Sequence, residues 1–351
     1  MADRCRDLSL NSCEWLDLKD FENSTILVTG GTGLVGHHLL EMLAEVKNVL
    51  NLTILALVRD KERAKSAFSG FSDKVELVVG DVMQEPIIDQ PIHYIIHSAS
   101  ITSSKAFIET PVDTILTSVF GLRNMLELSR KHSVRSMVYL SSMEAYGTQL
   151  EDKLLKETDV GYLNPLKLRS SYPESKRMCE SLCVAYAAQY GINVKIARLA
   201  QTIGPGIRPD DRRVIVQFLE SAKNNRNIEI KTSGESARMY LFTFDAATAL
   251  LTLLLKGEAG EAYNVANKDS YCSVRQLAQR ICDQFSPQSS VLVNTGSAEE
   301  QAIYPTDTFL RLDTTKIERL GWRAVVSLDD SLHRLMRVIE ERMPVGNARG
   351  E

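Results

Sequence analysis

The stretch Thr29-Gly-Gly-Thr-Gly-Leu-Val-Gly36 is rich in small residues and stands between two different hydrophobic patterns. The apolar run Thr25-Ile-Leu-Val28 before it predicts a buried strand, and residues 34–46 after it predict a helix with one apolar face. The glycines fit the spacings Gly31-x-Gly33-x-x-Gly36 and Gly30-x-x-Gly33-x-x-Gly36. In this strand–turn–helix setting, the backbone can approach a pyrophosphate at the start of the helix. We therefore predict a dinucleotide-binding loop rather than a merely tight turn.

Strands and helices alternate along the chain from residue 25 to residue 199. Short apolar strands separated by amphipathic helices predict an α/β fold, in which a doubly wound parallel sheet of the Rossmann type carries helices on both faces. The expected strands cover residues 25–28, 53–58, 75–79, 93–96, 136–140 and 194–199, and the expected helices cover residues 34–46, 111–131 and 171–190.

The pattern changes after residue 201. Gly204-Pro-Gly206 and a polar stretch up to residue 238 suggest excursions out of the sheet. We expect a smaller C-terminal substrate-binding lobe beside the dinucleotide-binding domain. The expected division is an extension or loose cap over 1–24, a dinucleotide-binding domain over 25–200 that is rejoined by about 239–266, and a substrate-binding lobe over 201–238 and 267–345.

The composition is that of an ordinary soluble globular protein, with 44% hydrophobic and 25% charged residues among 351. Its net charge of −4 gives no broad basic field, so nucleic acids and membranes are not expected partners. No apolar run approaches the roughly 18 residues of a membrane-spanning helix, and the start of the chain is too charged for a signal peptide. The six cysteines include no Cys-x-x-Cys pair, and no metal site is expected. These features predict a reduced, cytoplasmic protein.

The residues that follow the second and third expected strands bear on the choice of dinucleotide. An acid after the second strand would hold a ribose 2′-hydroxyl, whereas an arginine favours a 2′-phosphate. The chain has Arg59 at this point, followed by Asp60, so NADP is favoured and NAD stays possible. Asp81, just past the third strand, is placed to meet the adenine edge, although a solvated turn would also accept an aspartate there.

A tyrosine and a lysine stand four residues apart in Tyr172-Pro-Glu-Ser-Lys176, at the start of an expected helix and therefore on one face. A free tyrosine has a pKa near 10, too high for easy proton exchange at neutral pH. A neighbouring cation favours the phenolate and lowers that pKa. Ser142 lies 30 residues earlier, just after an expected strand, and supplies a hydroxyl group.

Together these motifs resemble the extended short-chain dehydrogenase/reductase family, the NAD(P)-dependent nucleotide-sugar epimerases and dehydratases. The resemblance covers about residues 25–335. It rests on Thr29–Gly36, Gly80-Asp81, His97-Ser-Ala-Ser100, Ser141-Ser-Met-Glu-Ala-Tyr-Gly147, Tyr172-x-x-x-Lys176, Gly204-Pro205, Gly234-Glu-Ser-Ala-Arg238 and Ala262-Tyr-Asn-Val-Ala266.

The resemblance implies an enzyme that binds a nucleotide-diphosphate sugar and oxidises it at C4 with a bound nicotinamide. Epimerisation, elimination or decarboxylation would follow, and the cofactor would be regenerated. It implies that Tyr172 is the base, that Lys176 holds the nicotinamide ribose and that Ser142 binds the reacting sugar oxygen. The implied cofactor-binding residues are Gly30, Gly33, Leu34, Val35, Gly36, Arg59, Asp60, Asp81, Val82, Ser98, Ala99, Ser100, Tyr172 and Lys176, and the implied substrate-binding residues are Ser142, Gln201, Arg213 and Arg238.

The two residues after Ser142 limit the reactions that the chain could catalyse. Family dehydratases that act on thymidine-linked glucose commonly carry two acids there, one to donate and one to abstract a proton. This chain has Met143 followed by Glu144, so the first acid is absent. Relatives with a neutral residue before the glutamate include decarboxylases of nucleotide-linked uronic acids, GDP-mannose dehydratases and some ketoreductases. Glu144 is then a catalytic candidate for proton transfer beside a transient 4-keto group, or a residue that only orients the substrate.

Two departures from the family pattern leave the subfamily open. Ser118 replaces the usual asparagine of an Asn-Val-x-Gly segment, and Gln201 replaces the asparagine usually found after the sixth strand. One alternative function is an NADPH-dependent reductase of nucleotide-4-keto-sugars, which Arg59 favours. Another is a catalytically idle dinucleotide-binding regulator, although a regulator would not need Ser142, Tyr172 and Lys176.

The resemblance also implies a homodimer, because relatives pair through the helices that correspond to residues 111–131 and 171–190. Apolar residues on these helices would supply the contact surface. The candidates are Leu116, Val119, Leu126, Met178, Leu182 and Ala185.

Overall fold

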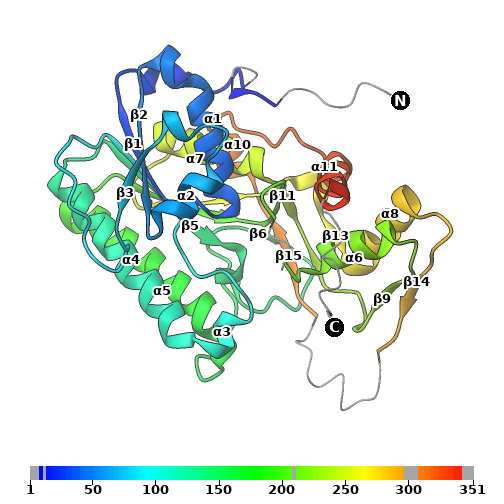
Figure 1. Cartoon of the computed structure of the whole chain (residues 1–351). Coiled ribbons are helices and arrows are strands. Elements are labelled where there is room, and N and C mark those ends of the chain that lie inside the picture. The colour runs from blue at the N-terminus through cyan, green and yellow to red at the C-terminus, as the bar shows by residue number, and fades with distance from the viewer. Residues whose placement is uncertain (1–7, 11–12, 208–210, 296–306, 342–351) are drawn as a thin grey trace, which may run out of the picture.

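A computed structural model of the chain describes residues 8–10, 13–207, 211–295 and 307–341 (Figure 1). Residues 1–7, 11–12, 208–210, 296–306 and 342–345, which belong to the predicted extension and substrate-binding lobe, lie outside the described residues.

The central sheet has seven strands, all parallel, in the order β12-β7-β5-β4-β1-β2-β3. Its order runs outward in both directions from β1, so the carboxyl ends of β1 and β4 mark a switch point in the topology, where ligands bind in open α/β sheets. The predicted doubly wound sheet is therefore confirmed. Its strands are β1 (Thr25–Thr29), β2 (Thr53–Val58), β3 (Glu76–Val79), β4 (Tyr94–His97), β5 (Ser136–Ser142), β7 (Val194–Leu199) and β12 (Ala262–Val265).

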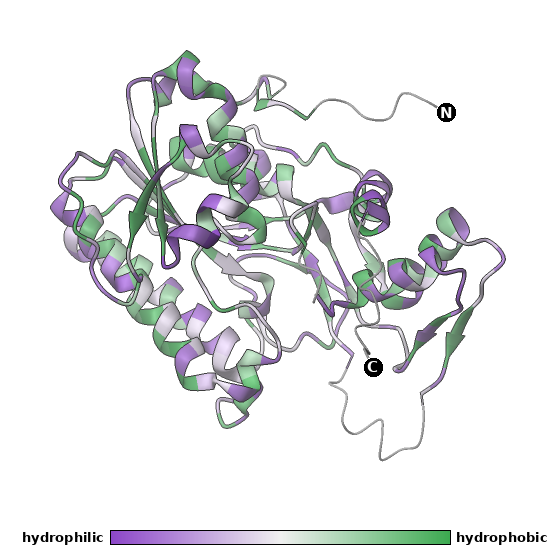
Figure 2. Cartoon of the chain, viewed as in Figure 1, coloured by the Kyte–Doolittle hydropathy of each residue, from purple (hydrophilic) through white to green (hydrophobic). Residues whose placement is uncertain are grey.

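Helices cover both faces of this sheet. One face packs on α1 (Leu34–Leu50), α2 (Lys61–Ala67) and α7 (Thr243–Lys256), and the other on α4 (Pro111–Lys131) and α5 (Ser171–Tyr190). Alternate residues of each strand enter the two cores. In β1, Ile26 and Val28 face α1 while Leu27 faces α4. Along the helices, hydrophobic residues alternate with hydrophilic ones (Figure 2), as expected for helices with one face on the sheet and one in solvent.

A second lobe lies beside the carboxyl edge of the sheet and has its own hydrophobic core. It contains a four-stranded sheet in the order β13-β10-β15-β6 and the parallel pairs β11–β8 and β14–β9. β6 comes from before residue 200, so this lobe is not built only from later residues as expected. The elements are β6 (Leu154–Leu155), β8 (Gln201–Ile203), α6 (Val214–Lys223), β9 (Ile228–Ile230), β10 (Ala237–Arg238), β11 (Tyr240–Phe242), β13 (Cys272–Ser273), α8 (Val274–Phe285), β14 (Val291–Val293), β15 (Phe309–Leu312) and α11 (Leu328–Glu341). The short helix α10 (Thr315–Glu318) packs against β12 and contributes Ile317 to the main core.

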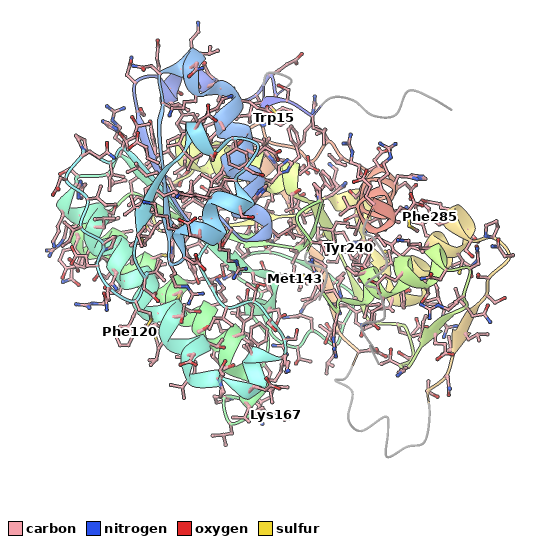
Figure 3. All side chains as sticks on the ribbon, viewed as in Figure 1. Trp15, Phe120, Met143, Lys167, Tyr240 and Phe285 are labelled. Carbon is pink, nitrogen blue, oxygen red and sulfur yellow. The ribbon has the colours of Figure 1, made fainter. Side chains whose placement is uncertain are left out.

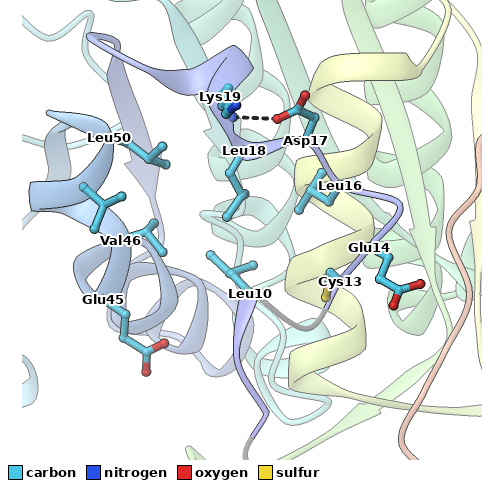
Figure 4. Close-up of a pocket in the computed structure, with 11 residues that line it drawn as sticks. Leu10, Cys13, Glu14, Leu16, Asp17, Leu18, Lys19, Glu45, Val46 and Leu50 are labelled. Atoms are coloured by element: carbon cyan, nitrogen blue, oxygen red, sulfur yellow. Dashed lines mark hydrogen bonds between the residues drawn. The ribbon is translucent and has the colours of Figure 1, made fainter.

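The segment before β1 packs more tightly than the expected loose cap. Leu10 and Phe21 are at most 1% exposed and join the main core. A cavity of about 360 Å³ lies between this segment and the last turns of α1, lined by Leu16, Glu45 and Val46 among others (Figure 4). Because α1 starts at the carboxyl edge of the sheet, its last turns lie at the opposite edge, and this cavity is remote from the predicted catalytic residues.

Within the described ranges, no helix combines the length and the apolar character that crossing a bilayer requires. The five cysteines in these ranges are buried, as expected for thiols that pack as small apolar groups.

Candidate active site

The glycine-rich loop connects β1 to α1 at the switch point. Gly30 has a φ of +72°, and a Cβ there would lie 2.7 Å from the backbone nitrogen of Ala99. A Cβ on Gly36 would collide with the carbonyl oxygen of Gly30. Gly33 is exposed and precedes the first turn of α1, which begins with the half-buried Leu34 and Val35. The first N–H groups of a helix lack partners within it, so this bare loop fits the pyrophosphate of a dinucleotide.

Thr29, at the end of β1, is hydrogen-bonded to the last residue of β4 and to the two residues that follow it. Its side-chain oxygen shares a 2.7 Å hydrogen bond with Nδ1 of His97 and accepts a 3.2 Å hydrogen bond from the backbone N–H of Ala99. The Ser98 hydroxyl donates to the Thr29 carbonyl oxygen at 2.6 Å. Ser100 is hydrogen-bonded to Ser118 on α4 at 3.3 Å. Burial, and then the charge of Lys176, lowers the pKa of His97 to about 3, so this imidazole is neutral at neutral pH.

The strand ends beyond the loop carry the residues predicted to bind adenosine. Arg59 is exposed directly after β2. The Asp60 carboxylate accepts a 3.0 Å hydrogen bond from the backbone N–H of Arg63 and thereby caps α2. Asp81 accepts a 2.9 Å bond from the backbone N–H of Met83. Val82 is buried, and its carbonyl oxygen accepts a 2.8 Å bond from the side chain of Asn124 on α4.

Three of the four predicted catalytic residues meet where β5 ends against the first turns of α5. Ser142 closes β5, and its hydroxyl oxygen accepts a 3.2 Å hydrogen bond from the backbone N–H of Glu144. The Tyr172 ring stacks on Phe107, with centroids 4.4 Å apart and planes within 10°. Lys176 is buried, donates to the carbonyl oxygen of Leu140 at 2.7 Å, and places its ammonium 5.5 Å from the centre of the Tyr172 ring.

Burial dominates the titration of this group of side chains. It raises the pKa of Tyr172 above its usual value, and the negative charge of Glu144 raises it further, while a hydrogen bond with Ser142 and the charge of Arg169 lower it. Burial also lowers the pKa of Lys176 to about 8. Burial therefore favours the neutral phenol, and a further positive charge beside the ring would favour the phenolate.

Glu144, the fourth catalytic candidate, sits in the short turn over Met143–Tyr146 and is held by Arg169, which the sequence did not single out. One guanidinium nitrogen of Arg169, Nη2, donates to both carboxylate oxygens of Glu144 at 3.1 and 2.9 Å. Met143 is 5% exposed and joins the main core, and Figure 3 shows it where the two lobes meet. The position where some relatives carry a second acid is therefore apolar in this chain.

A buried polar network contacts β5, the strand that ends at Ser142. Arg198 on β7 and Glu180 on α5 form an ion pair at 2.7 Å, with side chains only 7% and 10% exposed. Glu180 also accepts a 2.5 Å hydrogen bond from the hydroxyl of Ser141, the neighbour of Ser142. Asn264, on β12, accepts a bond from Tyr146 and donates to the carbonyl oxygen of Leu155 in the second lobe. The network thus connects the catalytic strand, α5 and the second lobe.

The predicted substrate-binding residues of the second lobe lie on separate elements from the catalytic group. Gln201 is half-buried in β8, and Arg238 is half-buried in β10. Arg213, just before α6, directs Nε and Nη2 to Asp211 and Nη1 to the carbonyl oxygen of Thr202. All three of its nitrogens are thus engaged inside the lobe, so Arg213 is poorly placed to bind phosphate without rearrangement.

The structure thus brings Ser142, Glu144, Tyr172 and Lys176 together at the end of β5. The glycine loop follows β1, and Ser98 and Ala99 follow β4, which lies between β1 and β5 in the sheet. Sequence reasoning missed three residues here: Thr29, His97 and Arg169. Thr29 and His97 stood inside quoted motifs, but their pairing depends on the register that sets β1 beside β4. No spacing in the sequence indicated that Arg169 would reach Glu144.

Comparison with known proteins identifies the class of enzyme. The model of a family described as the NAD dependent epimerase/dehydratase family matches residues 26–266. The chain belongs to this family, which confirms the predicted class of nucleotide-sugar enzyme. The family description names NAD, which the sequence left possible beside the favoured NADP.

Two curated relatives are similar to the chain in sequence, and two solved structures share its fold. The chain is 30% identical over 318 residues to UDP-glucuronic acid decarboxylase 1 of Arabidopsis thaliana, covering 91% of this chain and 70% of that one. It is 29% identical over 313 residues to decarboxylase 5 of the same plant, covering 88% and 87%. The fold matches UDP-glucose 4-epimerase from Thermotoga maritima, solved with UDP-glucose, with a TM-score of 0.74, 22% identity and coverage of 90% and 98%. It also matches dTDP-glucose 4,6-dehydratase from Streptomyces venezuelae, solved with NAD, with a TM-score of 0.74, 24% identity and coverage of 90% and 97%.

Proposed function

We propose that the chain is a decarboxylase of a UDP-linked uronic acid, with UDP-glucuronic acid as its substrate. The observation that carries this proposal is the buried Met143 before Glu144. Elimination of a sugar hydroxyl needs an acid that protonates the leaving oxygen, whereas carbon dioxide leaves without a proton. An apolar side chain at this position therefore suits loss of carbon dioxide better than the acid-assisted loss of water of the dehydratases that carry two acids there. The decarboxylases similar to this chain over about nine-tenths of its length support the same reaction.

The residues at the end of β5 fit the proton transfers of this reaction. NAD, held by the glycine-rich loop, Tyr172 and Lys176, would supply a hydride acceptor for C4 of the sugar and a hydride donor for the last step. Tyr172 takes the proton of the C4 hydroxyl, and Ser142 donates a hydrogen bond to the same oxygen. The resulting 4-ketone lies β to the carboxylate, so the C5–C6 bond breaks with its electron pair entering the enolate at O4. Tyr172 and Ser142 stabilise that oxygen, and Glu144 is the neighbouring group that can carry a proton to C5.

The decisive experiment offers purified chain UDP-glucuronic acid labelled with ¹⁴C at the carboxyl carbon, and follows released radioactive carbon dioxide. UDP-glucose and dTDP-glucose are assayed in parallel by NMR. We expect carbon dioxide and a UDP-pentose in amounts that exceed the cofactor present, and no change in the neutral sugars. Conversion of UDP-glucose or dTDP-glucose without release from the uronic acid would refute the proposal.

Arg59 supports a second candidate, an NADPH-dependent reductase of nucleotide-4-keto-sugars. Arg59 is exposed after β2, and the neighbouring Asp60 carboxylate is engaged in capping α2. An exposed cation beside an acid that is already engaged favours the 2′-phosphate of NADP, the cofactor of net reductions. Consumption of NADPH in a one-to-one ratio with a 4-keto-sugar would support this function over decarboxylation.

We also propose a homodimer, and a cytoplasmic location remains our expectation. Leu116 and Met178 are 37% and 55% exposed on α4 and α5, and Phe120 points outward from α4 (Figure 3). Leu126 is fully buried in the core, so the sequence-based choice of this residue for the dimer surface was wrong. Light scattering at micromolar concentration tests the dimer, and Phe120→Glu should convert it to monomers.

A further inference from the structure

Arg169 lies between the catalytic acid and an aromatic stack that includes the catalytic tyrosine. Its guanidinium carbon is 4.8 Å from the centre of the Phe107 ring, and that ring is stacked on Tyr172. Its Nη2 donates to both oxygens of Glu144. The charges of Arg169 and Glu144 both affect the titration of the Tyr172 phenol, in opposite directions. Arg169 is therefore close to the oxygen that would take a proton from the sugar.

The guanidinium of Arg169 has unused donors. Glu144 occupies Nη2 alone, and across the described ranges Nε and Nη1 of Arg169 donate to no other group. Other arginines of the chain differ in this respect. Arg198 directs Nε and Nη2 to Glu180 and Nη1 to the carbonyl oxygen of Glu157, and Arg213 likewise has all three nitrogens engaged. The Arg169 side chain is also 44% exposed, so a ligand can reach it.

A uronic acid brings a second carboxylate to a site that already contains Glu144. Two carboxylates repel each other unless a cation lies between them, and a guanidinium can bind more than one carboxylate because it carries five N–H donors. A neutral hexose gains nothing from that cation beyond an ordinary hydrogen bond. The pairing of Arg169 with Glu144 is thus a potential means of discriminating between sugars by charge.

We propose that Arg169 is the specificity-determining residue that binds the C6 carboxylate of the uronic acid through Nε and Nη1 while Nη2 continues to hold Glu144. This inference rests on the proposed decarboxylase function and assigns recognition of its substrate. Arg169 stabilises the carboxylate before the C5–C6 bond breaks, so it contributes to binding and orientation rather than to bond cleavage. Its loss should therefore raise KM for the uronic acid more than it lowers kcat.

The test compares Arg169→Met with Arg169→Lys and with Lys167→Met as a matched control. Lys167 is an exposed cation two residues away on the same loop (Figure 3). Binding of UDP-glucuronic acid and of UDP-glucose is measured by calorimetry, and KM and kcat are measured for carbon dioxide release. UDP-glucose reports whether the folded nucleotide site survives, because it differs from the uronic acid only at C6.

We expect Arg169→Met to weaken UDP-glucuronic acid binding by about tenfold or more, the effect of a lost charge-assisted hydrogen bond, and to leave UDP-glucose binding nearly unchanged. Arg169→Lys should recover part of the difference, and Lys167→Met should behave as the unmodified chain. Equal weakening of both ligands, or no weakening of either, would overturn the inference. The release of labelled carbon dioxide by the unmodified chain tests the proposed function separately. If no carbon dioxide is released from UDP-glucuronic acid, the proposed function is wrong, whatever the variants of Arg169 show.

Discussion

The cofactor side of the active site presents mainly backbone, whereas the substrate side presents charged and hydrogen-bonded side chains. On the cofactor side, Gly30 and Gly36 leave no room for a Cβ, and Thr29 fixes the neighbouring backbone. On the substrate side, Glu144 and Arg169 are positioned by each other, and Glu180 and Arg198 support the strand beneath them.

The two sides of the site recognise different kinds of ligand: the cofactor side binds a constant group, and the substrate side must distinguish one sugar from another. A dinucleotide has a constant pyrophosphate, which N–H groups at a helix start can bind without sequence-specific side chains. Sugars differ in their hydroxyl and carboxyl groups, which only side chains of matching charge and geometry can distinguish. Substitutions on the two sides should therefore have different consequences, and variants at both sides test the comparison.

The largest effect is expected from Tyr172→Phe. This change removes the proton-accepting oxygen but keeps the ring that stacks on Phe107. General acid–base catalysis contributes about a hundred- to ten-thousand-fold to the rate, so kcat should fall by at least about a hundredfold. NAD affinity and Tm should stay nearly constant. Turnover is measured with UDP-glucuronic acid, and an active Tyr172→Phe variant would mean that another group takes the proton.

A large loss of stability is expected from Glu180→Gln. The substitution keeps the shape of the side chain and leaves the buried Arg198 without its carboxylate partner. Breaking a buried ion pair in this way typically costs about 3–5 kcal/mol. The free energy of unfolding is measured in urea. Glu62→Gln, which breaks an exposed pair with Lys65, is the control and should cost at most about 1 kcal/mol. Similar losses in both variants would contradict a supporting role for the network.

A smaller effect, confined to the cofactor side, is expected from Gly36→Ala. The new methyl group would meet the Gly30 carbonyl oxygen, and overpacking of this kind costs about 1–3 kcal/mol. NAD affinity should fall by about tenfold or more as the loop shifts. Gly70→Ala is the matched control, because its Cβ would meet no atom within 4 Å. Unchanged NAD binding in Gly36→Ala would show that the loop tolerates a side chain after all.

The smallest effect is expected from Arg59→Ala, which should weaken NADP binding by about tenfold, or about 1.4 kcal/mol, and leave NAD binding unchanged. Arg59 is exposed, so its contact with a 2′-phosphate is screened by solvent. Affinities for both dinucleotides are measured on the unmodified chain and on the variant. A tenfold preference of the unmodified chain for NAD would agree with the proposed decarboxylase and would count against the NADPH-dependent reductase.

The large domain was predictable because buried parallel strands give continuous apolar runs. The strands β1, β2 and β7 and the helices α4 and α5 begin where the sequence placed them. The strand β5 extends to Ser142, two residues further than its apolar run, because Ser141 and Ser142 pair with Arg198 and Leu199 of β7. Polar residues at a strand end are therefore easily assigned to the following loop.

The second lobe was less predictable for a physical reason. Its strands have two to four residues and pair with segments far away in the sequence, so they produce no local period. The helix α6 was also missed, although Ile215, Val216 and Leu219 form its apolar face, because it lies within the stretch up to residue 238 that is polar overall. Likewise, the contact between Arg169 and Glu144 depends on how α5 packs against β5, which no motif encodes.

The transient use of the nicotinamide can be tested with UDP-glucuronic acid that carries deuterium at C4 and a sub-stoichiometric amount of unlabelled NAD. Mass spectrometry and NMR locate the label in the product. If hydride leaves C4 and returns within one cycle, the UDP-pentose will retain one deuterium at C4 through many turnovers. Loss of the label to the cofactor pool or the solvent, or net consumption of reduced cofactor, would contradict internal recycling and favour the reductase.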